Sequence, residues 1–273
     1  MKHTTLFSSL LLLTLFGVSC NDHLVDPATA TCRLTEINGA FIDGLKSTFE
    51  YDANGRLIRQ YRKFDGIAFD YKHTYDAQGL LSRSEFTDLD DAGKVVSENT
   101  ETYTWLNGKL VQFNYDGAFK GVNKLTYNAS GQLIGFTVET ENDPANNSKW
   151  AYTYDNNGVL IRRLLTSLDG TEVIFEARLT YTTTEIIKTA FSLMPKSGMP
   201  VDPVLGRPWE SSYPKNDGVL SYYLADSTGK LELLAKGTLK DMTFNQSGIA
   251  TGWNYGDVTG DLTPASFRID GCQ

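Results

Sequence analysis

Histidine is nearly absent from this chain of 273 residues, which has three. His3 and His23 precede the expected folded domain, so a Ser-His-Asp triad or a Cys-His pair would depend on His73 alone. The Gly-x-Ser-x-Gly motif of a nucleophile elbow is also missing. Zinc sites with several His or Cys ligands are excluded by count. We expect His73 to be a surface or hydrogen-bonded sheet residue, and we predict no catalytic residue, no metal and no cofactor.

Positive charge is also in short supply. The chain has 25 Lys and Arg against 33 Asp and Glu, a formal net charge of −8. Binding to nucleic acid phosphates needs clustered Lys and Arg, so we predict no nucleic acid partner. Because Asp and Glu are plentiful, the sequence does not exclude a pair of catalytic carboxylates like that of glycosidases. The segment Asp88–Gly93 resembles the start of a calcium loop, but Ala92 and Asn99 stand where the EF-hand pattern needs an oxygen ligand and a bidentate Glu, so we interpret the segment as a turn.

Long apolar runs are confined to the N-terminus. Leu6–Phe16 is apolar except for Ser8, Ser9 and Thr14, and small residues follow it. This pattern is typical of a secretory signal, which we place at residues 1–19. No later stretch approaches the roughly 18 apolar residues that a transmembrane helix needs. We therefore expect the protein to be exported.

Cysteine is as rare as histidine, at three residues. Cys20 follows the apolar run, and Gly17–Cys20 resembles the lipobox of bacterial lipoproteins, in which this cysteine is acylated with palmitate-type chains. Ordinary cleavage after Ser19 is the alternative. Acylation of Cys20 would leave an even pair, for which we predict a Cys32–Cys272 disulfide. Residues 20–31 are polar, and we interpret them as a tether to the cell envelope, with the outer membrane as the expected location.

A seven-residue motif recurs along the chain with the pattern Tyr-Asp/Asn-x-x-Gly-x-Leu. Asp or Asn opens a type I turn by accepting backbone N–H groups, and Gly then takes the left-handed conformation. This turn places Tyr opposite Leu as a cross-strand apolar pair. We therefore assign structural turns to Tyr51, Asp52, Gly55, Tyr75, Asp76, Gly79, Tyr127, Gly131, Tyr154, Asp155 and Gly158.

A second set of turns alternates with the first. It comprises Asp65-Gly66, Asp90–Gly93, Asp116-Gly117, Asn142–Asn147 and Asp169-Gly170. Alternation of two turn sets predicts an up-and-down antiparallel meander with one set at each end of the sheet. The predicted fold class is all-β, with about 15–17 strands curled into a roll, half-barrel or barrel, because open sheets rarely exceed about 10 strands. We expect no substantial helix outside the signal peptide.

The meander is interrupted at residues 194–217, where five prolines exclude a regular central strand. We assign residues 32–273 to one β-meander domain that contains this Pro-rich loop. Trp209 in the loop, with Trp253 and Tyr255 near the C-terminus, are candidate ligand contacts, because aromatic side chains dominate recognition surfaces. The alternative is that these rings fill the interior of the roll.

The Tyr-Asp-x-x-Gly-x-Leu units resemble the YD repeats of Rhs-type proteins. Together with the lipobox, the meander and the Leu205-Gly206-Arg207 segment, the chain is similar to Gram-negative lipoproteins of unknown function with a porin-like fold. The resemblance implies the architecture and no ligand.

Three functions remain open from the sequence. The first is a non-catalytic envelope lipoprotein, held to the membrane by its lipid, that binds a glycan, peptide or protein partner. The second is a carbohydrate-active enzyme that uses Asp and Glu. The third is an outer-membrane barrel or pore component, against which charges on both strand faces argue.

Overall fold

The computed structural model describes residues 32–39, 44–118, 120–141, 144–193, 212–215, 217–257 and 260–271. The predicted signal peptide and tether lie outside these residues, as do Cys20, Trp209 and Cys272. No helix in the described ranges is long and apolar enough to cross a membrane.

The described residues form eighteen strands and two short 3-10 helices. Their bounds are β1 Arg33–Asn38, β2 Lys46–Tyr51, β3 Leu57–Phe64, β4 Ile67–Tyr75, β5 Leu81–Leu89, β6 Val95–Leu106, β7 Lys109–Gly117, β8 Gly121–Tyr127, β9 Leu133–Thr140, η1 Pro144–Asn146, β10 Ser148–Tyr154, β11 Leu160–Ser167, β12 Val173–Thr180, β13 Ile186–Thr189, η2 Ala190–Leu193, β14 Ser212–Pro214, β15 Val219–Ala225, β16 Leu231–Phe244, β17 Ile249–Asp257 and β18 Leu262–Asp270.

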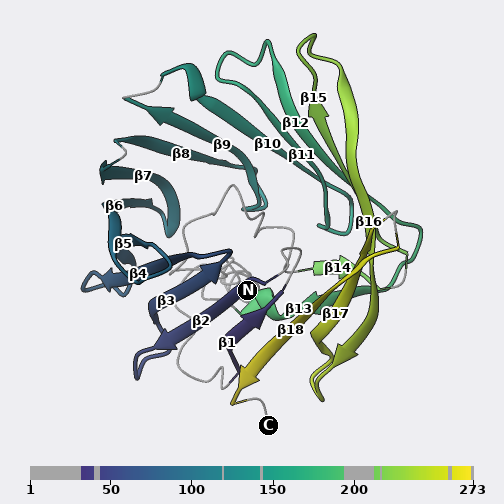
Figure 1. The fold of residues 1–273 in the computed structure, drawn as a ribbon, viewed down its shortest axis with the longest axis horizontal. Coiled ribbons are helices and arrows are strands. Elements are labelled where there is room, and N and C mark those ends of the chain that lie inside the picture. The colour runs from purple at the N-terminus through teal and green to yellow at the C-terminus, as the bar shows by residue number, and fades with distance from the viewer. Residues whose placement is uncertain are drawn as a thin grey trace, which may run out of the picture.

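Sixteen of these strands close into a ring, as Figure 1 shows. Each strand from β1 to β12 pairs antiparallel with its neighbour in sequence, β12 pairs with β15, and β15–β18 continue the ladder. The ring closes where β18 pairs with β1, with Arg33 opposite Asp270. The predicted all-β meander is confirmed, and its curled form is a closed barrel. Closure removes the open edges that a sheet of this size would otherwise present.

A short hairpin interrupts the ring between β12 and β15. Within it β13 pairs antiparallel with β14 and parallel with β17, and η2 contacts β1 and β17. β13 and β14 are drawn within the outline of the ring in Figure 1. Ser212–Pro214 falls in the predicted Pro-rich loop but forms β14, a strand of three residues. Residues 194–211 of that loop lie outside the described residues.

The strand ends differ from the sequence interpretation mainly in β16. Two separate strands are expected near Leu231–Lys236 and Met242–Phe244, but the structure has one strand of fourteen residues. The region between them is irregular rather than broken, because the register shifts between Lys240 and Thr243 and Asp241 adopts a φ of 52°. A bulge keeps the strand continuous while it bends.

The barrel has two distinct ends, because every second turn of a meander lies at the same end. The tyrosine-turn end carries the turns that follow Tyr51, Tyr75, Tyr127 and Tyr154, and the turn at Asn245–Gly248. The Asp-Gly end carries the other set, at Asp65-Gly66, Asp90–Gly93, Asp169-Gly170, Asp226–Gly229 and Asp257–Gly260. Cys32 precedes β1 at the tyrosine-turn end, so the chain enters the barrel there.

The repeated turn has the geometry that its residue types predict. In its first copy, Asp52 Oδ1 accepts the backbone N–H groups of Asn54 and Arg56, at 2.9 Å each. Gly55 has a φ of 81°, a left-handed conformation that a side chain would strain. Tyr51 lies opposite Leu57. Hydrogen bonding to the ionised carboxylate has a further consequence: although burial raises the pKa of Asp52, the bonds from Arg56 and Asn54 hold it below its ordinary value.

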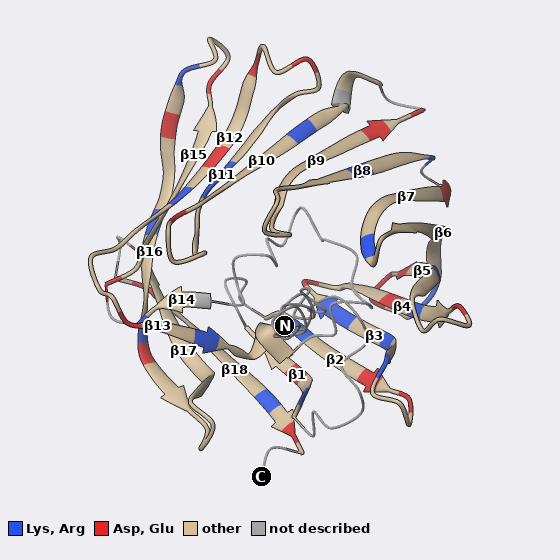
Figure 2. Cartoon of the chain, turned by 180° about the vertical axis from the view of Figure 1, so that it is seen from behind, with Lys and Arg blue, Asp and Glu red and all other residues tan. Residues whose placement is uncertain are grey.

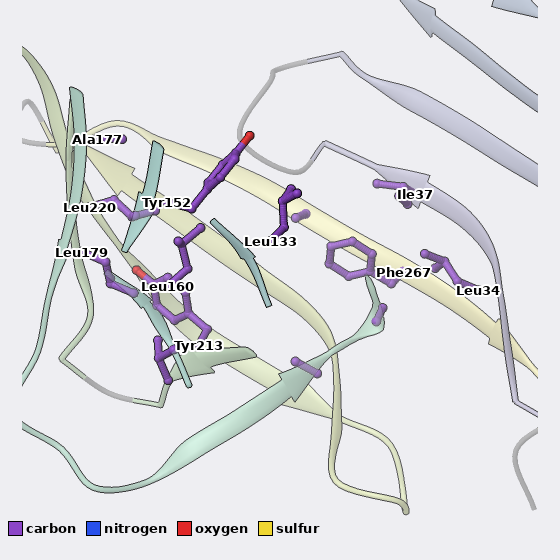
Figure 3. Packing of buried hydrophobic residues seen from close by; sticks show 14 of the residues in the cluster. Leu34, Ile37, Leu133, Tyr152, Leu160, Ala177, Leu179, Tyr213, Leu220 and Phe267 are labelled. Carbon is purple, nitrogen blue, oxygen red and sulfur yellow. The ribbon is translucent and has the colours of Figure 1, made fainter. Parts of the chain in front are cut away.

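The apolar face of the wall points into the barrel. Its side chains form one cluster that includes Leu34 and Phe267 from the adjacent β1 and β18, Phe136 of β9 and Leu220 of β15, together with Tyr213 of β14. Figure 3 shows members of this cluster gathered between opposite parts of the wall. No described element lies outside the ring to cover an outward apolar face. Most side chains with almost no exposure belong to this inward face. Glu176 is an exception, because it lies on the outward face of β12 and is covered there by its ion pairs with Arg162 and Arg178.

The opposite face of the strands is polar and charged. Arg59 pairs with Asp70 at 2.7 Å, and Lys124 pairs with Glu139 at 2.8 Å. Charged residues of both signs occur on strands all around the barrel in Figure 2. Exposed ion pairs of this kind contribute little to stability.

Candidate functional site

The tyrosines of the repeated turns tie each turn to the one before it. The Tyr75 hydroxyl donates to the Leu57 carbonyl at 2.7 Å, where Leu57 is the leucine of the preceding copy. The same bond recurs from Tyr51 to Leu34, Tyr127 to Leu110 and Tyr154 to Leu133. Leu106–Leu110 is a degenerate copy of the repeat, with Asn107 and Gly108 in its turn. There the indole N–H of Trp105 donates to the Leu81 carbonyl in the same way. The repeat therefore encodes a chain of hydrogen bonds across strands as well as a turn.

Leu34 and the leucines that follow the repeated turns form a buried layer at the tyrosine-turn end. Leu34, Leu57 and Leu81 are fully buried, and Leu110, Leu133 and Leu160 are nearly so. Arg33, Arg56 and Lys109, each one residue before such a leucine, lie over the rings of Tyr51, Tyr75 and Tyr127. This arrangement packs the wall of the barrel at the tyrosine-turn end.

The aromatic residues predicted as ligand contacts are placed differently. Trp253 is buried, and its ring lies 4.5 Å from that of Phe267 in the interior cluster. Tyr255 is half-buried against the same cluster, and burial raises the pKa of its hydroxyl. Both positions fit the alternative that these rings fill the interior. Trp209 lies outside the described residues. Roles in ligand binding therefore stay predictions.

A polar patch interrupts the apolar inner wall on β3–β6. The strand register aligns it in rows, because Gln60 lies opposite Tyr71, Tyr71 opposite Phe86, and Phe86 opposite Asn99. We call this set the inner patch, and it comprises Gln60, Arg62, Phe69, Tyr71, His73, Ser84, Phe86, Asp88, Asn99, Glu101 and Tyr103. Comparable positions on β9–β12 are mainly apolar, as at Phe136, Trp150 and Ala177, although Arg163 is buried there over the Trp150 ring.

A continuous hydrogen-bond chain runs through the inner patch. His73 Nδ1 lies 2.7 Å from Ser84 Oγ, and the Tyr103 hydroxyl donates to Ser84 Oγ at 2.9 Å. Tyr103 also contacts the Glu101 carboxylate. Burial, and then the negative charge of Glu101, raise the pKa of Tyr103 well above its ordinary value, so this phenol stays protonated. His73 is thus a hydrogen-bonded sheet residue, as the sequence suggested.

The geometry of this chain does not fit nucleophilic catalysis. Ser84 is fully buried, so its hydroxyl cannot meet a substrate. The carboxylates of the patch are also badly placed for glycoside hydrolysis. Glu101 lies opposite Ser84, whereas Asp88 lies opposite Ser97, four residues away along β6. Four residues of strand span about 13 Å, beyond the separation of about 5–10 Å that glycosidase pairs use.

Aromatic rings cover the inner patch toward the Asp-Gly end. The rings of Tyr71 and Phe86 stack with centroids 4.6 Å apart, and Phe69 stacks on Phe86 at 5.9 Å. All three side chains are half-buried. Flat apolar faces beside hydrogen-bonding side chains are the combination that recognises a sugar ring or another flat polar ligand.

No metal site accompanies these groups among the described residues, in which no three His, Cys, Asp or Glu side chains gather. A further buried polar group lies outside the patch, on β8. Asn123 is buried on the inner face of β8 beside Phe113, and its Oδ1 has no hydrogen-bond partner in the described part of the chain. An orphaned buried acceptor is costly unless a ligand or water meets it.

Sequence reasoning missed the inner patch, although a usable signal is present. Phe69, Tyr71, His73 and Tyr75 alternate along one strand, which places all four on the same face. The alternation of residues along β4 is therefore enough to predict a row of aromatic rings on one face of the strand. It does not show that this row faces inward or that Ser84, Glu101 and Tyr103 lie beside it, since those contacts cross strand pairs.

Comparison with protein-family models finds no match, and comparison with curated proteins finds none either. Among solved structures, a porin-like protein from Bacteroides uniformis is similar at 14% identity and a TM-score of 0.42, covering 87% of this chain and 96% of that chain. A porin-like protein from Bacteroides vulgatus has 10% identity and a TM-score of 0.38, with 86% and 98% covered. TcdB2-TccC3 has 12% identity and a TM-score of 0.27, and the likeness covers 78% of this chain and 14% of that one. TM-scores this low carry no argument about fold or function. The assignment of a closed barrel is based on the strand pairing of this chain.

Proposed function

We propose that this protein is a non-catalytic cell-envelope lipoprotein whose barrel stands in water and binds a glycan on the inner patch. The observation that carries the proposal is the stack of Phe69, Phe86 and Tyr71 beside hydrogen-bonding side chains on the inner wall. Stacking rings supply affinity for the faces of a sugar, and the polar groups beside them supply orientation.

The outer wall supports a barrel in water rather than in lipid. A membrane barrel shows an outward apolar band about 25 Å tall. Here the outward face carries Arg59, Asp70, Lys124 and Glu139 in mid-strand positions. The chain with Cys20→Ala, which cannot be acylated, is therefore expected to stay monodisperse in buffer without detergent. A requirement for detergent would favour the outer-membrane pore instead.

The anchor at Cys20 would orient the barrel. Twelve residues from Cys20 to Thr31 reach at most about 43 Å when fully extended, and they join the wall at the tyrosine-turn end. The Asp-Gly end, which lies nearer to the stacked rings, would then be the end farther from the attachment point. This arrangement leaves the mouth of the barrel accessible to a ligand outside the membrane surface.

Binding is tested by calorimetric titration of the unacylated chain with a panel of neutral oligosaccharides. We expect at least one to bind, and Phe86→Ala to weaken it about tenfold through lost stacking. Phe175→Ala is the matched control, because Phe175 is a half-buried inward ring on β12 beyond the patch. Equal losses in both variants, or no binding at all, would refute the proposal, and cleavage of the oligosaccharide would instead favour the carbohydrate-active enzyme.

A further inference from the structure

The β15–β16 hairpin at the Asp-Gly end carries leucines that the barrel does not cover. Leu233 and Leu234 are 54% and 63% exposed, and Leu224 is also exposed. In Figure 1 this hairpin rises at the side of the ring beside that of β11–β12, whose turn adds the exposed Leu168. We call these four residues the leucine tip.

The leucines lie on both faces of the hairpin. Leu224 continues the inward row, because it lies opposite Phe175 of β12. Leu233 pairs with Tyr223, which belongs to the outward face, and Leu234 is the extra residue of a bulge between Tyr222 and Tyr223. A hairpin that is wet on both faces normally carries polar side chains on both. Apolar side chains gathered on such a hairpin mark a place where another molecule binds.

Acidic residues surround the leucine tip. The two hairpin ends carry Asp169, Glu172, Asp226 and Glu232 against a single cation, Lys230, which pairs with Glu232 at 3.5 Å. Hydrogen bonds from Thr228 and Ser167 hold the pKa of Asp226 and of Asp169 below the ordinary value, so both carboxylates stay ionised. The apolar surface therefore sits in a negative field.

The charge decides between possible occupants. An anionic bilayer surface would repel the tip. A second copy would bring like charges together, and the whole chain has a net charge of −8. We propose that the leucine tip docks a protein segment that presents an apolar face flanked by Lys and Arg. This partner is separate from the glycan of the inner patch.

The test uses two synthetic amphipathic peptides of about 18 residues, five helical turns. One combines a leucine face with lysines, and the other replaces every lysine with glutamate. Fluorescence anisotropy is expected to show that the full chain binds the lysine peptide, more weakly at high salt, and does not bind the glutamate peptide. Leu233→Ser/Leu234→Ser is expected to weaken the binding about tenfold.

The control is Ile58→Ser/Leu106→Ser, which removes two exposed apolar side chains at the tyrosine-turn end. It is expected to leave the affinity within about twofold. Equal effects of the two double variants would overturn the proposal, as would an unchanged affinity of the tip variant. Binding to phosphatidylcholine–phosphatidylglycerol vesicles that the tip variant abolishes would identify a membrane surface instead. Self-association in sedimentation experiments that this variant abolishes would identify a second copy.

Discussion

The two ends of the barrel are built from the same turn yet differ in what they bury. At the tyrosine-turn end the turns that follow Tyr51, Tyr75, Tyr127 and Tyr154 each precede a fully or nearly buried leucine. Each of these four tyrosines also donates its hydroxyl to the neighbouring strand. At the Asp-Gly end the turn at Asp90 accepts the same backbone bonds, but the residues beside it, Val95 and Val96, are exposed. The turn residues therefore determine only the conformation of the hairpin. The side chains beside the turn determine whether that end of the barrel is packed or is open to a ligand.

The largest expected difference between the ends is in packing. Leu81→Ala removes a fully buried side chain and should lower the free energy of unfolding by about 2–5 kcal/mol. Val96→Ala, at a residue that is 68% exposed, should change it by less than about 0.5 kcal/mol. Denaturant titration of both variants measures the contrast. Similar losses in the two would mean that the Asp-Gly end is packed as tightly as the other.

Alkaline titration should separate the bonded tyrosines from exposed ones. Burial raises the pKa of Tyr127 to about 12 and that of Tyr154 to about 12. Because the folded pKa lies above the unfolded value of about 10, the stability contributed by these phenols is complete below pH 10 and is lost as the pH rises toward 12. Ultraviolet difference spectra of Tyr127→Phe and Tyr154→Phe should each lack one late-ionising phenol. Loss of a phenol that ionises near pH 10 would contradict the assignment.

Removing one hydroxyl tests the bonds between turns. Tyr75→Phe deletes the donor to the Leu57 carbonyl and should cost about 1 kcal/mol. Tyr115→Phe is the counterpart toward the Asp-Gly end, where the hydroxyl shares a 3.1 Å bond with Thr140. That side-chain partner can reorient toward water, so the cost should be less than about half as large. Thermal unfolding distinguishes the two, and the reverse ranking would remove the special role of the repeat tyrosines.

The smallest expected effect concerns a turn carboxylate. Although burial raises the pKa of Asp155, bonds from Tyr181 and from the backbone of Val159 and Asn157 hold it below its ordinary value. A lowered folded pKa contributes stability that is present above the unfolded value of about 3.9 and is lost as the pH falls through the folded one. Asp155→Asn should therefore lower stability by a few tenths of a kcal/mol at pH 7 and by nothing near pH 2. A difference that persists in acid would show that charge is not its source.

Much of the fold could be predicted because its signals are local. Asp52, Gly55 and the Tyr51–Leu57 pair lie within seven residues, so turn chemistry alone fixes them. The alternation of two turn sets then gives the meander and its two ends. The bonds between turns were missed, because Tyr75 and Leu57 are eighteen residues apart and no local rule joins a phenol to that carbonyl. The continuous β16 was missed because a bulge and a break look alike in sequence.

The candidate site was harder to predict than the fold. The inner patch depends on register across β3–β6, which brings His73, Ser84 and Tyr103 together from three strands. Trp253, predicted as a ligand contact because it is a prominent aromatic near the C-terminus, is packed on Phe267, and its role in ligand binding stays a prediction. The Cys32–Cys272 bridge remains a prediction, and the Arg33–Asp270 pairing supports it by joining the two strands that these cysteines flank.

The sequence by itself determined the hairpins, their order and the end of the barrel at which each turn lies, because these follow from backbone conformations a few residues long. Only the tertiary structure decided that the meander closes and which face turns inward. Closure rests on pairing between β1 and β18, more than 230 residues apart. Side chains alternate between the two faces of every strand, and this alternation does not say which face lies inside. That is decided only when the ring closes and one face is removed from water.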